Sequence, residues 1–205
     1  MSTGRATALV IGLLAIASAG CTVGNEPTTT NAPATPPAAP TTKPQPTETT
    51  ATQTLDLNTR PGAQPSVTDG IPHIHLDQTS SDEVLAELAE WAFSLDGIVE
   101  LPSLASLPGA RALTVAPGLP LNSGAMLVAR EFAHIHPQPN WGSLHLRLSP
   151  AAAQEVVERG WGEYHPFAID GSIPNLVMVY APRSGEDLGS VKAIIEASVA
   201  FATSG

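Results

Sequence analysis

The stretch from Glu131 to Leu148, EFAHIHPQPNWGSLHLRL, constrains the fold of this chain more than any other. Two runs of alternating residues flank a segment of proline, asparagine, tryptophan and glycine that is typical of a turn. In the second run, the leucines fall on one face of a strand and the polar residues fall on the other. The pattern predicts a β-hairpin with one apolar and one polar face.

The pairing across this hairpin decides which side chains share a face, because directly opposed residues of an antiparallel pair do so. The pairs expected are, from the turn outward, His136 with Ser143, His134 with His145, and Phe132 with Arg147. The leucines cannot all face water, so their burial turns His145 away from the core. A slip of two residues would set His136 opposite His145, and a slip of one would bury His145 and expose the leucines. We expect one face to carry His134, His136 and His145.

The charge balance argues against nucleic-acid binding. The 205 residues include 9 Lys and Arg against 19 Asp and Glu, a formal net charge of −10 at pH 7. Nucleic-acid-binding surfaces carry clustered positive charge, whereas the arginines nearest the hairpin are scattered. We therefore expect no nucleic-acid partner.

The N-terminus has the pattern of an export signal. Arg5 precedes an apolar core from Ala8 to Ala17, which is too short to span a membrane. The small residues before Cys21 resemble the cleavage site of bacterial lipoproteins, in which the cysteine becomes the first mature residue and is lipid-modified. Ser18 departs from this pattern, since leucine is usual there. Residues 1–20 are predicted to be a lipoprotein signal peptide, with Cys21 as the lipidation site.

The predicted location follows from Cys21, the single cysteine of the chain. Palmitate and the other acyl chains of a lipoprotein would anchor the protein to the cell membrane on its extracytoplasmic side. An ordinary secretory signal with a chance cysteine is the alternative, and it would give a secreted protein.

Residues 21–69 are rich in proline, threonine and alanine and contain almost no large apolar side chains. Such a composition cannot bury enough surface to offset the entropy of ordering, so we expect a disordered, extended linker. The folded domain is predicted to span residues 70–205, starting near Ile71.

Caps, periodicity and turns divide the domain into elements. Ser80 and Glu83 form a capping box. The expected helices cover residues 81–95 and 151–159, and a last helix capped by Ser184 and Asp187 runs to about Phe201. The expected strands outside the hairpin cover 111–116 and 175–181, with a further strand starting within 125–129 and a loop over 101–110. This order predicts a single small α+β domain, with a mainly antiparallel sheet packed by about three helices.

Three stretches together resemble a known family. They are EFAHIHPQPNWGSLHLRLSP from Glu131, GWGEYHPF from Gly160 and VMVYAPRSGEDLGSVKAIIEAS from Val177. They look like the luciferase domain family of bacteria and fungi. The resemblance implies a shared fold and carries over no catalytic residues. A weaker likeness in the order of elements, to the MmcQ/YjbR-like proteins, agrees with a small α+β sheet.

The histidines are the sharpest candidates for a site. Cross-strand neighbours lie close enough for two imidazoles to reach one ion, so His134, His136 and His145 are a candidate set for a divalent metal. They can equally be hydrogen-bonded structural residues. Together with residues that follow the hairpin, the same three are expected to line a ligand pocket, with the full set His134, His136, His145, Arg147, Trp161, Glu163 and His165. Trp141 in the turn is a further aromatic candidate. His73 and His75 form a second His-x-His pair near the domain's start, interpreted as a chance pair.

Three functions remain open at this stage. The first is a lipoprotein whose domain binds a small ligand, the second a metal- or histidine-dependent enzyme of the cell envelope, and the third an interaction module displayed on a stalk. No nucleophile motif or phosphate-binding loop is present in the sequence, so the catalytic residues are unknown and the sequence does not decide whether the protein is an enzyme.

The anchoring hypothesis gives a first prediction. Cys21→Ala should release the protein from membranes or leave the precursor unprocessed, because the substituted residue has no thiol to acylate. Fractionation of cells expressing either form, followed by blotting, measures this. A wild-type protein already in the soluble fraction would contradict the hypothesis.

Overall fold

The structure, a computed structural model, describes residues 54–137 and 142–205. The expected signal peptide, Cys21, residues 21–53 of the expected linker and Trp141 lie outside these residues. The described elements, in chain order, are α1 Asp82–Phe93, β1 Ile98–Pro102, β2 Arg111–Val115, the 3-10 helix η1 Ser123–Ala125, β3 Glu131–Ile135, β4 Leu144–Arg147, α2 Pro150–Glu158, β5 Gly162–Tyr164, α3 Pro166–Ile169, β6 Leu176–Val179 and α4 Gly185–Thr203.

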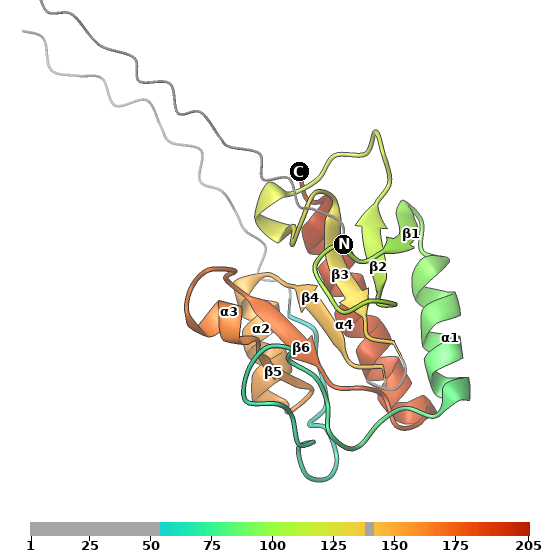
Figure 1. The fold of residues 1–205 in the computed structure, drawn as a ribbon, viewed down its shortest axis with the longest axis vertical. Helices are drawn as coiled ribbons and strands as arrows, with labels where there is room; N and C mark the ends of the chain where they lie inside the picture. The colour runs from blue at the N-terminus through green and yellow to red at the C-terminus, as the bar shows by residue number, and fades with distance from the viewer. Residues whose placement is uncertain (1–53, 138–141) are drawn as a thin grey trace, which may run out of the picture. The chain divides into compact units, whose positions relative to one another are not determined.

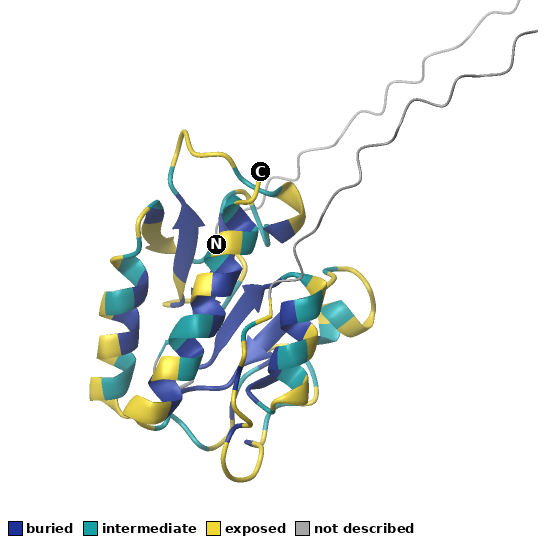
Figure 2. Cartoon of the chain, turned by 180° about the vertical axis from the view of Figure 1, so that it is seen from behind, coloured by how far each residue is buried: buried dark blue, intermediate teal, exposed yellow. Residues whose placement is uncertain are grey.

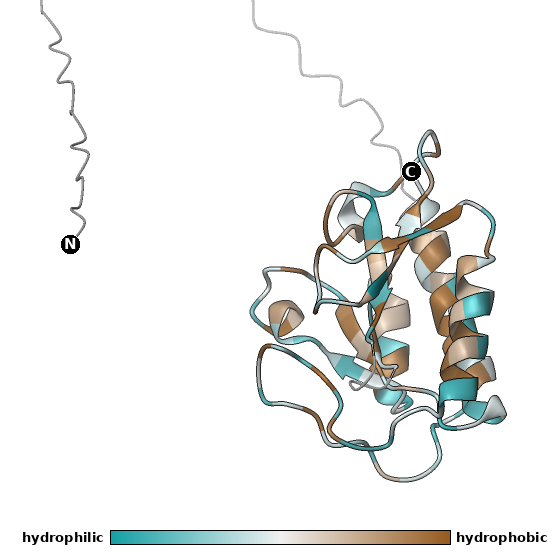
Figure 3. Cartoon of the chain, turned by 45° about the vertical axis from the view of Figure 1, so that its right-hand side comes forward, coloured by the Kyte–Doolittle hydropathy of each residue, from teal (hydrophilic) through white to brown (hydrophobic). Residues whose placement is uncertain are grey.

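The six strands form one antiparallel sheet in the order β1-β2-β3-β4-β6-β5 (Figure 1). Seen from behind, α1, α4 and α2 lie in front of the sheet, whose central strands are buried (Figure 2). The same helices carry hydrophobic stretches beside hydrophilic ones (Figure 3), as expected for helices with one face on a core. The predicted fold class, a small α+β domain with an antiparallel sheet, is confirmed.

The predicted hairpin is present as β3 and β4. His134 lies opposite His145, Ala133 opposite Leu146 and Ile135 opposite Leu144. The His136 amide also donates to the Ser143 carbonyl at 2.9 Å, as the predicted register requires. The leucines of β4 are fully buried in one core with the apolar residues of α4. Their burial turns the alternate residues of β4 to the face away from the helices.

A β-bulge interrupts β3 at its first residues. β2 pairs Leu113 with Ala133 but Thr114 with Glu131, so Phe132 is an extra residue on the bulged strand. Phe132 enters the hydrophobic core, and the predicted pairing of Phe132 with Arg147 is therefore wrong. Regular alternation would put residues three apart on opposite faces. The bulge instead lets the Glu131 carboxylate reach His134.

The residues before Ile71 pack on the domain, earlier in the chain than the boundary expected from composition. The amides of Leu55 and Leu57 donate to the Glu155 carboxylate at 2.8 Å each, and the Trp161 indole donates to the carbonyl of Asn58 at 2.6 Å. Leu57 is buried in the core cluster. Composition does not reveal these contacts, because only a few residues of a long polar stretch make them.

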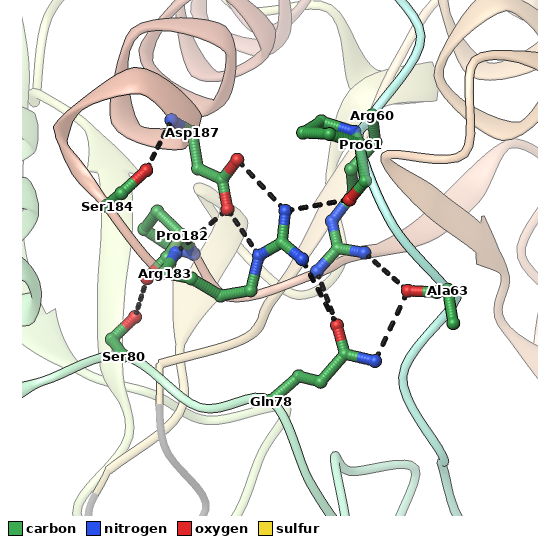
Figure 4. Close-up of polar contacts among 9 residues, drawn as sticks. All are labelled: Arg60, Pro61, Ala63, Gln78, Ser80, Pro182, Arg183, Ser184 and Asp187. Carbon is green, nitrogen blue, oxygen red and sulfur yellow. Dashed lines mark hydrogen bonds and ion pairs between the residues drawn. The ribbon is translucent and has the colours of Figure 1, made fainter.

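Arg183 ties this segment to the start of α4, and Arg60 forms hydrogen bonds within the N-terminal region (Figure 4). Arg183 forms an ion pair with Asp187 at 2.6 Å and donates to the Pro61 carbonyl at 3.0 Å. Arg60 donates to the Ala63 carbonyl and to Gln78, each at 3.1 Å. Both guanidinium groups therefore hold the loop that precedes the first His-x-His pair.

Three local expectations were wrong. β1 occupies part of the region expected to be loop, since an edge strand tolerates the terminal Pro102. No strand covers residues 125–129, where η1 ends and the Arg130 side chain instead donates to three backbone carbonyls. Ser81 rather than Ser80 caps α1, because the Ser80 hydroxyl donates to the Pro182 carbonyl at 2.6 Å.

The packing of the N-terminal segment gives a second prediction. A chain starting at Asp69 should unfold at a lower urea concentration than a chain starting at Thr54, because it loses the buried Leu57 and the bonds to Glu155. The expected loss is about 2 kcal/mol or more. Urea unfolding followed by circular dichroism measures it. Equal midpoints would show that residues 54–68 do not stabilise the domain.

Candidate functional site

All six histidines of the chain are buried, and none is more than 6% exposed. Five of them form one contiguous cluster of rings on the sheet face away from α1, α2 and α4. Its centre is His145, whose ring centroid lies 4.5 Å from those of His136 and His165, 5.1 Å from that of His134 and 5.5 Å from that of His73. The sixth, His75, packs on Tyr180 at 5.4 Å.

Separate parts of the chain deliver these rings. His134 comes from β3, His136 directly follows that strand, and His145 comes from β4. His165 is the N-cap of α3, directly after β5. His73 and His75 come from the segment that the two arginines hold. From the sequence alone, His73 and His75 are interpreted as a chance pair. The repeat of the His-x-His pattern is the one sequence signal that could have placed them at the site.

Carboxylates fix the two outer rings of the cluster. His134 Nδ1 lies 3.0 Å from Glu131 Oε1, and His73 Nε2 lies 2.8 Å from Glu163 Oε1. An ionised carboxylate only accepts, so each of these nitrogens must carry the proton. Neutral His134 therefore has a bare Nε2, and neutral His73 has a bare Nδ1.

The same reasoning assigns His145 and His165. His134 Nε2 lies 3.2 Å from His145 Nδ1, so the His145 proton sits on Nδ1 and its Nε2 is bare. His165 Nδ1 accepts the amide of Phe167 at 3.1 Å, which places the His165 proton on Nε2. The site thus offers bare acceptor nitrogens beside one N–H donor.

Several of these buried nitrogens have no hydrogen-bond partner among the residues that the structure describes. They are His73 Nδ1, His145 Nε2 and both nitrogens of His75. Such unpaired buried groups are uncommon and mark places where another molecule or ion can bind.

Burial keeps four of the histidines uncharged. The pKa of His136 is lowered to about 3 and those of His165 and His75 to about 4, mainly by desolvation and in part by neighbouring cationic or histidine side chains. The pKa of His145 is lowered well below its ordinary value for the same reason. At neutral pH these four rings are therefore neutral.

The carboxylates remain ionised beside them. Burial by itself raises the pKa of Glu131, but hydrogen bonds from His134, Ser103 and the Leu104 amide lower it overall. The His73 hydrogen bond is the main cause of the lowered pKa of Glu163.

Two cavities adjoin the cluster. One of about 250 Å³ is bordered by His73, His136, His145 and His165 together with apolar residues such as Ile74 and Leu107. The other, of about 240 Å³, is bordered by His134, His145 and His165. His145, His165, Ala105 and Phe167 border both, so the two cavities meet at the centre of the cluster.

The structure brings together most of the predicted site residues, but not all. Glu163 and His165 join the histidines of the hairpin. Arg147 does not border either cavity, because its guanidinium donates to the carbonyls of Met126 and Gly124. Trp161 packs in the core with its indole N–H on Asn58. Sequence reasoning missed Glu131 and His73 as members of the site.

Two groups of three histidines have the spacing of metal ligands in the described part of the chain. Each group offers ring nitrogens that all lie within 4.8 Å of one another. The groups are His134, His136 and His145, and His73, His145 and His165.

The comparisons with known proteins point to one family. Residues 129–198 match the family described as Luciferase domain. Proteins named Luciferase from Armillaria mellea and Armillaria gallica are each 32% identical to this chain over 136 residues, which is 65% of this chain and 47% of each relative. A Luciferase from Neonothopanus nambi is 32% identical over 105 residues, 46% of this chain and 39% of the relative.

This chain thus spans about half the length of the curated relatives it matches. No solved structure matches it. Within the described residues, no helix has the length and apolar character to cross a membrane.

The neutral histidines give a third prediction, on stability. An unfolded histidine has a pKa near 6.5, so below that pH the unfolded chain binds more protons than the folded one. The stabilisation is complete above about pH 6.5 and is lost as the pH falls towards 4. His75 alone should account for on the order of 2 kcal/mol between pH 7.5 and 5. Urea unfolding at both pH values measures the change.

His75→Phe is the matched variant for this effect. The groups acting on His75 are Arg60 and His73, which lower its pKa, and Asp77 and Glu163, which raise it. Phenylalanine keeps the contact with the neighbouring aromatic ring and removes the titrating group. The variant should be at least as stable as wild type at pH 7.5, because it removes two buried nitrogens that have no partner in the described residues. It should also be less sensitive to acid, and an unchanged pH dependence would contradict the argument.

Proposed function

We propose that this chain, in which residues 129–198 belong to the luciferase domain family, binds a small organic molecule in the histidine-lined cavities of that domain. The relatives are named Luciferase, and this chain covers about half of each of the Armillaria proteins. The ligand class is therefore argued from the cavities themselves. The observation that carries the proposal is the presence of two unpaired nitrogens, His73 Nδ1 and His145 Nε2, on rings that border the cavities.

The size of the site fits a small molecule. The two cavities of about 250 and 240 Å³ together fall within the range of about 300–1,000 Å³ for small-molecule sites. Exposed apolar side chains, among them Ile71, Leu104 and Phe167, border these cavities. This arrangement favours a ligand pocket over an interaction module.

The polar groups of the site select a ligand with a hydroxyl on an apolar frame. His73 Nδ1 and His145 Nε2 are acceptors without a partner among the described residues, and His165 Nε2–H is a donor. A hydroxyl group can donate to one acceptor and accept from the donor. Phe167 beside them offers an aromatic surface for a ring.

Histidine-dependent acid–base catalysis is a weaker second candidate. A general base works best when its pKa is near the operating pH, whereas burial lowers the pKa values of His136 and His165 to about 3 and 4. Such rings accept hydrogen bonds at neutral pH but take a proton poorly. Their neutrality supports binding of a hydroxyl or a metal more than proton abstraction.

The fourth prediction tests ligand binding with umbelliferone, a fluorescent hydroxylated coumarin, against coumarin, which lacks the hydroxyl. Fluorescence titration should give tighter binding of umbelliferone to the wild-type protein. His165→Asn should weaken this binding about tenfold, because one hydrogen bond is lost. Asparagine is a good N-cap, so α3 keeps its cap in this variant.

The control is on the same helix. Phe167→Ala should also weaken binding, while Ile169→Ala should not, because Ile169 is 75% exposed and borders neither cavity. Equal affinity for both coumarins, or equal effects of the two α3 truncations, would contradict the proposal.

A further inference from the structure

Two ring nitrogens on β3 and β4 stand at the spacing of metal ligands. His134 Nε2 and His145 Nδ1 are 3.2 Å apart. Ligands at 2.0–2.1 Å from a tetrahedral metal are separated by about 3.3–3.4 Å. His136 completes the group, in which one ring nitrogen from each of the three histidines lies within 4.8 Å of the others. A metal can therefore replace the proton shared by the first pair if the rings turn so that both lone pairs point at the ion.

The rings of His134 and His136 are each held on the side remote from the proposed metal. The Glu131 carboxylate accepts from His134 Nδ1, and it is itself fixed by the Ser103 hydroxyl at 2.6 Å and the Leu104 amide at 2.9 Å. His136 Nδ1 lies 2.9 Å from the Ser143 hydroxyl. Metal-binding histidines are oriented in this way, by a carboxylate or another oxygen on the ring nitrogen remote from the metal.

The second group of three histidines is less suited to a metal. His165 uses its Nδ1 lone pair to accept the amide of Phe167, so the nitrogen left over carries a proton and cannot bind a metal. Freeing Nδ1 would uncap α3. No such conflict exists for His134 or His136. Their Nδ1 atoms can each donate a hydrogen bond, to the Glu131 carboxylate and to the Ser143 hydroxyl, and this leaves Nε2 free for a metal.

We propose that His134, His136 and His145 bind one divalent first-row transition metal ion, with Glu131 orienting His134. The site stands independently of the organic ligand proposed above. Three neutral imidazoles suit zinc, copper, nickel or iron rather than magnesium or calcium. They also leave a coordination position open, as in catalytic zinc sites.

The open position would face the ligand cavities. His134 borders one cavity, His136 borders the other, and His145 borders both. Metal on His145 Nδ1 requires the ring's proton to move to Nε2. Loading the metal would therefore turn the cavity-facing nitrogen of His145 from an acceptor into a donor. This coupling rests on the proposed ligand binding, whereas the metal site itself does not.

The test is calorimetric titration of the chelator-treated protein with Zn²⁺. We expect one Zn²⁺ per chain, loss of this binding in His134→Gln, and 10–100-fold weaker binding in Glu131→Gln, the range found for orienting partners of metal ligands. His75→Phe is the control and should bind Zn²⁺ like wild type, whereas His165→Asn tests the second group of histidines and should also keep Zn²⁺ binding if that group is not the site. Co²⁺ in place of Zn²⁺ gives a visible spectrum that reports the coordination geometry.

Several outcomes would overturn the proposal. Wild-type protein without stoichiometric Zn²⁺ binding rejects the site, and loss of Zn²⁺ in His165→Asn with retention in His134→Gln rejects the assigned ligands. If His134→Gln fails to fold, Glu131→Gln decides the matter, since wild-type Zn²⁺ affinity in that folded variant excludes the orienting role. Unchanged umbelliferone affinity after Zn²⁺ loading rejects the coupling alone and leaves the proposed ligand binding intact.

Discussion

The alternation of side chains along β4 ties the core of the domain to its candidate site. Leu144, Leu146 and Leu148 are fully buried on the side of α4, and this burial forces His145 onto the opposite face. A slip of one residue would expose the leucines at a cost of about 1.5–3 kcal/mol each. The hydrophobic core therefore sets the register that places His145 beside His134, and the site depends on the packing of α4 against the opposite face of the sheet.

The hairpin and the fold class could be predicted because they follow from local patterns of period two and from capping residues. The contact between His134 and Glu131 could not be predicted in this way. Alternation predicts that Glu131 faces away from His134, and only the bulge against β2 reverses this. A bulge depends on pairing with a distant strand and leaves no periodic signal. The position of Trp161 could not be foreseen for a related reason. Its indole N–H donates to the carbonyl of Asn58, which lies in the stretch that composition assigns to the linker.

The contribution of His73 and His75 was also beyond sequence reasoning. Their segment includes neither a helix nor a named strand, and its position depends on contacts of Arg60 and Arg183 with Gln78 and with backbone carbonyls. The contacts of Arg183 with Gln78 and with the Pro61 carbonyl join residues more than a hundred positions apart. The two arginines thus have an indirect role in the site, because they hold the segment that supplies the second His-x-His pair.

The electrostatics of the cluster connect its stability with its occupancy. Two ionised carboxylates, Glu131 and Glu163, serve the outer rings, and the inner rings remain neutral because burial opposes their protonation. Four of the six buried side-chain atoms without a partner in the described residues belong to histidines. Each such atom costs about 1–3 kcal/mol. A hydroxyl or a metal ion that satisfied His145 and its neighbours would remove part of this cost, so binding at the cluster should stabilise the fold in proportion to the nitrogens it engages.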